Sequence, residues 1–400
     1  SVTDNTQEDN KNNSFLLQLL EAKRKHPVNT GEYFPETGKL SCAANPRQTG
    51  GYLYKHPNQG MPYGFPPLSE KEYQRVATWL QQGSPGPSKA EQQQLKSPSP
   101  AAQAEIKQWE EFLNQDDAKH AMTARYLYEH LFLAHLNFND AAPKEFYQIV
   151  RSRTPSGEPI DIIATVRPYD DPGVDSFYYR FRKIHSTLVH KTHMVFKLDD
   201  SKLQRFKSLF IDPQWNETPY RVSYKDKISA NPFSAFAQIP AQSRYQFLLD
   251  NSEYIIRTFI RGPVCKGQIA LNVIHDHFWV MFLDPKSDMT LQEPGFLVEQ
   301  TNNLSLPTEK GSTVALRKVF SNVYRDRYSE FFHAKEELYK RYESKLNLNS
   351  IWKGEKSGDA PILTVYRHFD SASVHKGVLG DLPRTLWIID YPLFERIYYA

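Results

Sequence analysis

The spacing of apolar residues along the chain predicts both helices and strands. Apolar positions recur every three or four residues in the segments expected to be helical, namely 15–25, 70–82, 104–138 (one helix or two), 242–258, 314–346 and 392–399. Runs of β-branched and aromatic residues predict strands at 160–166, 177–181, 189–198, 269–282, 362–366 and 385–389. Since the sequence has neither an internal repeat nor a strict alternation of strands with helices, we predict an α+β fold.

The clearest local signal is a helix start at Ser69. Glu72 follows three residues later, which makes a capping box, and an apolar stripe then continues until Gly83 ends the helix. The preceding stretch from 26 to 67 is rich in Pro, Gly and Asn and is predicted to be loop.

Composition divides the chain into four parts. We expect a disordered, Asn-rich lead-in at 1–13 and a small helical unit at 14–84. Residues 85–103 combine four prolines with Ser, Gln and Lys, which predicts a linker, and 104–400 form a larger domain of helices and sheet. The start at Ser1 and the helix pattern that is still running at Ala400 indicate an internal fragment, incomplete at its C-terminus.

Charge and hydropathy exclude some classes of function. The 49 basic and 46 acidic side chains nearly cancel and are scattered, so the chain has no basic patch of the kind that binds nucleic acid. No apolar stretch approaches the roughly 18 residues of a membrane span. The 23 Tyr and 24 Phe fit either ordinary core packing or a cleft for an apolar ligand.

The segment 261–282 concentrates chemically capable residues. Cys265 lies between Arg261 and Lys266, which favours the thiolate and makes a nucleophile with His277 as its base conceivable. Alternatively, His275 and His277 lie two apart on an expected strand and share one face, while Asp276 points the other way. With the histidines at 185, 190 and 193 they suggest a metal site.

Other motifs carry less information. His120, His130 and His135 fall on the expected 104–138 helix and are interpreted as core or boundary histidines with satisfied hydrogen bonds. The sequence contains no Gly-rich phosphate loop after a strand, no Gly-x-Ser-x-Gly elbow and no zincin motif.

The Pro-rich stretch 60–69, followed by the capped helix with Trp79, resembles the C-terminal half of a c-type cytochrome domain. In that family a Met-Pro loop presents a thioether to the haem iron, and Met61 is the residue that matches. The haem-attachment motif Cys-x-x-Cys-His is absent from these 400 residues, so we expect it upstream. The alternative is a Pro-rich loop with a packed methionine.

Four collinear strings together resemble the bacterial fatty acid cis/trans isomerases of the haem c type. They are Gly-Met-Pro-Tyr-Gly at 60–64, the segment 124–135 from Ala-Arg-Tyr to Leu-Ala-His, the segment 261–282, and the C-terminal segment 382–400. The resemblance covers most of the chain.

This resemblance implies a periplasmic enzyme in which a haem c iron weakens the alkene, so that cis acyl chains become trans without a shift of the double bond. It implies Met61 as a haem ligand and five further site residues without assigned roles, namely Arg261, Cys265, Gln268, Asp276 and His277. The expected partner is an unsaturated fatty acid or a phospholipid acyl chain, with peripheral membrane contact.

Two other functions stay open at this point. One is an electron-transfer c-type cytochrome fused to a binding domain. The other is a non-haem metalloenzyme that uses His277 and the histidines at 185–193.

Overall fold

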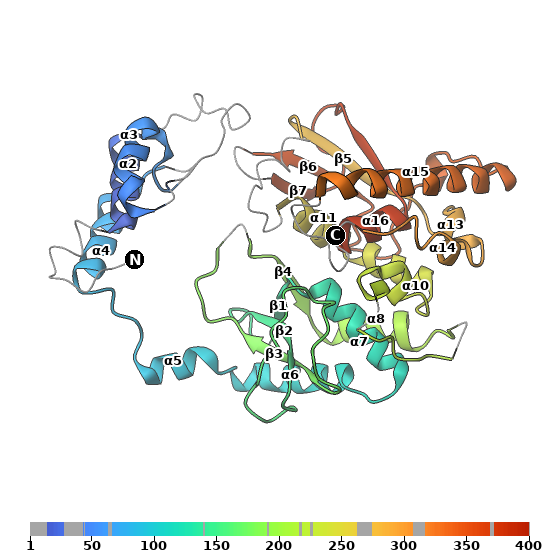
Figure 1. The fold of residues 1–400 in the computed structure, drawn as a ribbon, viewed down its shortest axis with the longest axis horizontal. Coiled ribbons are helices and arrows are strands. Elements are labelled where there is room, and N and C mark those ends of the chain that lie inside the picture. The colour runs from blue at the N-terminus through green and yellow to red at the C-terminus, as the bar shows by residue number, and fades with distance from the viewer. Residues whose placement is uncertain are drawn as a thin grey trace. The chain divides into compact units, whose positions relative to one another are not determined.

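The fold is taken from a computed structural model and divides into two compact units (Figure 1). The structure describes residues 14–27, 43, 45–62, 66–138, 141–189, 192–215, 218–224, 227–261, 274–306, 317–368 and 372–399. The first unit extends to Leu95, and the second begins at Lys96 and contains both sheets. The predicted α+β class is therefore confirmed.

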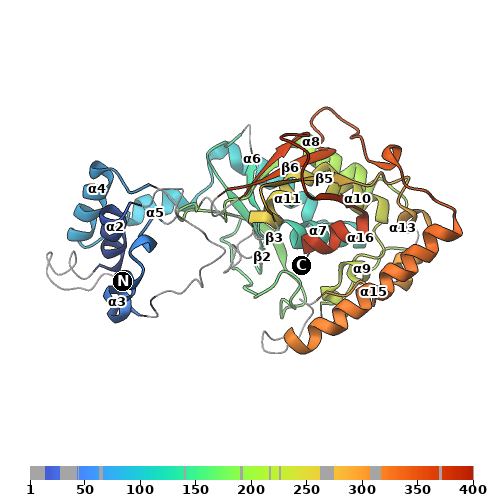
Figure 2. The ribbon, with the colours of Figure 1, turned by 90° about the horizontal axis from the view of Figure 1, so that it is seen from above.

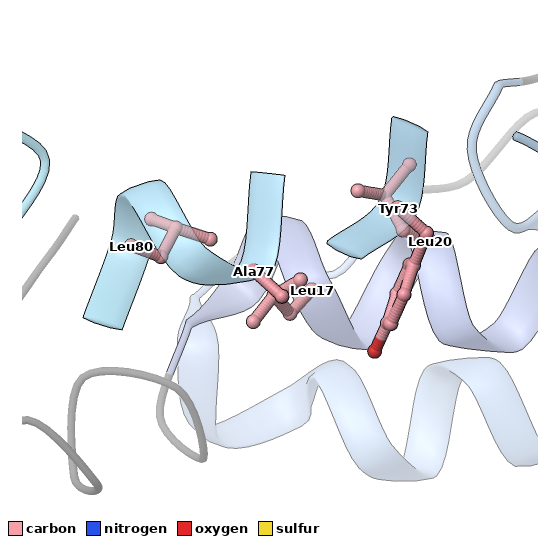
Figure 3. Close-up of a cluster of buried hydrophobic side chains, with 5 residues drawn as sticks. All are labelled: Leu17, Leu20, Tyr73, Ala77 and Leu80. Atoms are coloured by element: carbon pink, nitrogen blue, oxygen red, sulfur yellow. The ribbon is translucent and has the colours of Figure 1, made fainter. Parts of the chain in front are cut away.

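The first unit is helical and has a small apolar core. Its helices are α2 (Phe15–Lys25), η1 (Pro46–Gln48), α3 (Thr49–Lys55), η2 (Pro57–Gln59), α4 (Glu70–Gln81) and α5 (Lys89–Lys96). Side chains of α2 and α4 interlock in the cluster of Figure 3, formed by Leu17, Leu20, Tyr73, Ala77 and Leu80. The predicted capping box of α4 is present, with Ser69 and Glu72 exchanging hydrogen bonds.

One prediction for this unit needs correction. The stretch from 26 to 67 is not all loop, because it contains α3 and two 3-10 turns. The segment 85–103, predicted as a linker, includes the boundary between Leu95 and Lys96, and it contains α5 and the start of the next helix, which Ser99 caps. All side chains of α5 are exposed, so no apolar stripe could reveal this helix in the sequence.

Within the described part of the second unit, a first four-stranded sheet has the order β3-β2-β1-β4. Its strands are β1 (His135–Phe138), β2 (Tyr147–Ser152), β3 (Tyr178–Lys183) and β4 (Val195–Leu198). β1 is parallel to β4, and the other pairings are antiparallel. Helices α6 (Pro100–Leu113) and α7 (Ala118–Leu131) pack against β3 and β2, respectively.

A second sheet of four described strands has the order β7-β6-β5-β8 (Figure 1, yellow to red). Its strands are β5 (His277–Phe282), β6 (Ile362–Arg367), β7 (Ala372–Lys376) and β8 (Leu386–Ile389). Strand β5 pairs antiparallel with β6 and parallel with β8. One face carries the buried side chains of Phe278, Val280, Phe282, Leu363, Val365 and Ile389.

Helices connect the two sheets of this unit. α10 (Ala241–Asp250), α11 (Ser252–Arg261) and α16 (Tyr391–Tyr399) contact one another, and α16 also contacts α7. The longest described helix, α15 (Arg317–Arg341), runs along the outside of the unit (Figure 2, orange). The remaining short helical segments are α8 (Asp200–Phe206), η4 (Lys207–Ile211), η5 (Lys227–Ala230), α9 (Pro232–Ala235), α13 (Met289–Gln292), α14 (Phe296–Glu299) and η7 (Leu348–Ser350).

Two predicted elements of this unit differ in type or extent. The segment 104–138 contains two helices, which is one of the two arrangements expected, but its last part, from His135, is strand β1 and not helix. The expected strand at 160–166 is reduced to an isolated bridge between Ile162 and Ser152. No described helix has the length and apolar composition that crossing a bilayer requires.

Candidate functional site

Met61 lies on a loop that is held tightly against helix α2. Its backbone N–H donates a hydrogen bond of 2.9 Å to the carbonyl oxygen of Leu19. A Cβ on the preceding Gly60 would lie 2.4 Å from the backbone nitrogen of Lys23, so only glycine permits this close approach. Met61 is 41 % exposed, so it is not packed in the core.

In the second unit the structure brings together two of the predicted site residues, Asp276 and His277. His277 is the first residue of β5, and its Nδ1 lies 3.1 Å from a carboxylate oxygen of Asp276. The prediction that Asp276 points away from His277 is wrong, because Asp276 precedes the strand and does not obey its alternation.

The His277 ring is enclosed by strand β6 and by the loop 377–382. It stacks on Tyr366, with ring centroids 5.2 Å apart, and its Nε2 lies 2.8 Å from the carbonyl oxygen of Asp381. Gly380 has a φ of +79°, and a Cβ there would lie 2.6 Å from the Tyr366 hydroxyl. Glycine therefore allows the loop to close over the imidazole.

These contacts favour the protonated form of His277. Nδ1 faces a carboxylate oxygen of Asp276 and Nε2 faces the Asp381 carbonyl, so a protonated ring can donate to both oxygen atoms. The Asp381 carbonyl, followed by the Asp276 carboxylate, raises the pKa of His277 above its ordinary value of 6.5. An imidazolium has no free lone pair, so His277 in this state is not a base for a thiol.

Most of the other predicted site residues of this segment lie outside the described part of the chain. Arg261 ends helix α11, while its side chain lies outside the described residues, as do Cys265 and Gln268. His275 is exposed in a bend before β5, so the prediction that it shares a strand face with His277 is wrong.

The predicted histidine metal site finds no support among the described residues. No three His, Cys, Asp or Glu side chains in that part of the chain gather closely enough to hold a metal ion. His193 instead contacts His135, with their Nδ1 atoms 2.7 Å apart, while His190 lies outside the described residues. Burial and the neighbouring His193 lower the pKa of His135, which favours its neutral form.

A buried polar network, defined here as Arg125, Tyr126, Glu129, His130 and Glu395, joins helix α7 to helix α16. His130 and Glu395 are fully enclosed, with Nε2 and Oε1 2.6 Å apart, and Tyr126 also donates to Glu395 at 3.2 Å. Arg125 and Glu129 form a second enclosed ion pair at 2.8 Å. The interpretation of His130 as a satisfied core histidine is confirmed.

This network was missed as a unit by the sequence analysis. Its two halves come from 124–135 and 382–400, which are two of the strings that carried the family resemblance. The one signal for it is Glu395, which with Arg396 interrupts an otherwise apolar helix between Phe394 and Ile397. Tyr398 and Tyr399 reinforce the contact by donating to the His130 carbonyl and to Glu129, respectively.

Comparison with known proteins agrees with the resemblance seen in the sequence. A family model described as fatty acid cis/trans isomerase matches residues 1–400, the whole chain. No curated protein matches the chain, and no solved structure matches it.

Proposed function

The chain belongs to the fatty acid cis/trans isomerase family, and from this premise we propose that it uses a haem iron, which the thioether of Met61 would help to hold. The enzyme converts cis double bonds of unsaturated fatty acyl chains to trans. The family match over residues 1–400 is the observation that carries the isomerase activity, and it favours isomerisation over pure electron transfer.

The reaction itself makes few demands on the protein. Rotation about the double bond requires its π bond to weaken transiently, and the trans product is the more stable isomer. No hydride donor or nucleotide is therefore needed, which agrees with the absence of a phosphate-binding loop in the sequence. When bound, a ferric haem would supply an electron-withdrawing centre beside the alkene.

In the first unit, Met61 is suited to donate its thioether to a haem iron. Met61 is a partly exposed residue on a loop fixed by Gly60 and by the hydrogen bond to Leu19, so its backbone would lose little conformational entropy on binding the iron. Neither Cys42 nor Cys265 belongs to a Cys-x-x-Cys-His motif, so these 400 residues do not themselves supply haem c attachment. The proposal for haem therefore rests on Met61.

In the second unit, His277 would act as a fixed positive charge. When protonated, the ring would donate hydrogen bonds to Asp276 and to the Asp381 carbonyl and would have no lone pair left to accept a proton. We propose that it orients the lipid electrostatically and takes no part in proton transfer, which the rotation does not require.

We also propose that the enzyme lies in the periplasm and contacts the membrane peripherally. Its proposed substrate is an unsaturated acyl chain, either of a free fatty acid or of a phospholipid. Cell fractionation that recovers the isomerase activity with periplasmic markers would support the location, whereas recovery with cytoplasmic markers would oppose it.

The complete reading frame should be expressed in a host that matures c-type cytochromes and then assayed with palmitoleate by gas chromatography. We expect a haem absorbance band with the feature of methionine ligation, and trans product. Met61→Ala should keep the attached haem but lose the methionine feature and diminish the trans product, and Met61→His should lose the same feature while retaining a donor to the iron. A methionine feature unchanged in Met61→Ala would remove Met61 from the site.

A further inference from the structure

A buried cation in the first sheet has no acidic partner. Arg151, in strand β2, is fully buried and forms no ion pair with any residue that the structure describes. Arg180 of the adjacent strand β3, by contrast, lies 3.0 Å from Glu110. Arg125 of helix α7 likewise lies 2.8 Å from Glu129. Burying a charge is costly unless an opposite charge accompanies it, so Arg151 is the buried arginine of these three that lacks an anion.

The hydrogen bonds of Arg151 use only part of its guanidinium. Nη1 donates to the carbonyl oxygen of Asp170 at 2.9 Å, and Nη2 donates to the hydroxyl of Thr165 at 2.6 Å. Nε is buried and has no hydrogen-bond partner among the described residues. A guanidinium has five N–H groups, and the edge that contains Nε matches the two oxygens of a carboxylate. The two existing bonds therefore hold the loop 165–170 and leave this edge unpaired.

Three aromatic rings surround this guanidinium. Its Cζ lies 5.4 Å from the ring centroid of Tyr128, 5.7 Å from that of Phe177 and 5.5 Å from that of Tyr224. Tyr128 is buried, whereas Phe177 and Tyr224 are half-buried and form the side of the cluster that reaches the surface. Aromatic rings around one cation suit a ligand that joins an apolar chain to an anionic end.

The enclosure of Arg151 favours an anion at the end of a chain. A free fatty acid ends in its carboxylate, which a planar guanidinium can bind through two parallel N–H···O bonds. In a phospholipid the acyl ester is uncharged, and the phosphate is followed by a head group. A fully buried cation leaves no space for that head group beyond the anion.

We propose that Arg151 binds the carboxylate of a free unsaturated fatty acid and thereby fixes how far along the site its double bond lies. This inference rests on the proposed function, and it selects the free acid from the two sources of acyl chain considered there. On binding, the carboxylate displaces the half-buried rings of Phe177 and Tyr224, pairs with the unused N–H groups and neutralises the buried charge.

Equilibrium dialysis of the complete protein against palmitoleate and palmitoleyl alcohol tests the proposal, because the two ligands differ only in the end group. The wild type should bind palmitoleate at least about tenfold more tightly than the alcohol. Arg151→Gln should abolish this preference and leave the affinity for the alcohol unchanged. Arg153→Gln is the matched control, since Arg153 follows the same strand and is half exposed in a pair with Asp161, and it should keep the preference.

Arg151→Lys provides a second variant if Arg151→Gln does not fold. Lysine keeps the buried charge but lacks the planar fork, so the preference should fall severalfold. An unchanged preference in these variants would overturn the proposal. So would an equal loss of both ligands, which indicates a structural role only, or a preference lost in His277→Gln instead, which assigns the carboxylate to His277.

Two further readouts separate the substrate source and the isomerase function. Palmitoleoyl lysophosphatidylglycerol that competes as well as palmitoleate would contradict binding of a terminal carboxylate. Trans product is measured apart from binding. A protein that prefers palmitoleate but leaves it cis would contradict only the proposed function, whereas equal turnover of palmitoleate and its alcohol would contradict only the role of Arg151.

Discussion

Replacing Gly60 by alanine tests whether the Met61 loop depends on close contact with helix α2. The added Cβ would lie 2.4 Å from the Lys23 backbone nitrogen and 2.8 Å from the Leu19 carbonyl oxygen. Both atoms belong to the helix backbone, which cannot rotate away as a side chain can. Either the loop or the helix must therefore shift, and the hydrogen bond from Met61 to Leu19 is lost.

The expected cost combines two terms. Overpacking of this kind costs about 1 to 3 kcal/mol. The lost backbone hydrogen bond adds about 1 kcal/mol, so the free energy of unfolding of the first unit should fall by roughly 2 to 4 kcal/mol. For a unit of this size that corresponds to a melting temperature at least about 8 °C lower.

Gly51→Ala is the matched control for Gly60→Ala. Gly51 lies in helix α3, and a Cβ there would have no heavy atom within 4 Å. Alanine is the better helix former, so this variant should gain about 0.5 to 1 kcal/mol. Hydrogen exchange on peptides from α2 and α4 reports on the first unit alone. Unchanged exchange in Gly60→Ala would refute the tight contact between loop and helix.

Three further predictions concern buried or paired charges. Glu395→Ala leaves the enclosed His130 without its partner and should lower the free energy of unfolding by about 3 to 5 kcal/mol in urea denaturation. Asp276→Asn removes a carboxylate that stabilises the imidazolium, so the pKa of His277 should fall, as followed by NMR titration. Burial raises the pKa of Asp288 to about 6. The folded protein therefore holds this proton more tightly than the unfolded chain, so the stability that Asp288 contributes should be lost as pH rises from about 4 to about 6.

Each of these three predictions has a control or a contradicting result. Glu111→Ala breaks only an exposed pair with Lys107 and should change stability by less than about 1 kcal/mol. An equal loss in both glutamate variants would contradict the special role of Glu395. An unchanged His277 titration in Asp276→Asn would show that the carboxylate does not stabilise the charge. Asp288→Asn should flatten the pH dependence between 4 and 6, and an identical profile would place the proton elsewhere.

Local signals predicted the parts of the fold that depend on neighbouring residues in the sequence. Helix α4 was predicted because Ser69 and Glu72 make its capping box within one turn. Strand β1 was not predicted, because apolar spacing continues helically up to Phe138 and only the distant pairing with β4 makes His135–Phe138 extended. The run at 160–166 has strand composition but forms just one bridge, at Ile162.

In the candidate site, too, the sequence did not show contacts that depend on where a strand begins or on residues far apart in the chain. Asp276 and His277 are neighbours in the sequence, yet alternation assigned them to opposite faces, because the sequence does not show that the strand begins at His277. Glu395 and His130 are 265 residues apart, so no local pattern could pair them. The family resemblance selected both segments, although it did not indicate that they touch.

Incubation of the purified protein with palmitoleate in D2O tests the isomerase account most directly. Rotation about a weakened double bond exchanges no proton, so the account predicts trans palmitoleate with the double bond in place and the mass unchanged. A protein that leaves palmitoleate cis, or a trans product that carries deuterium on its carbon chain, would contradict the account.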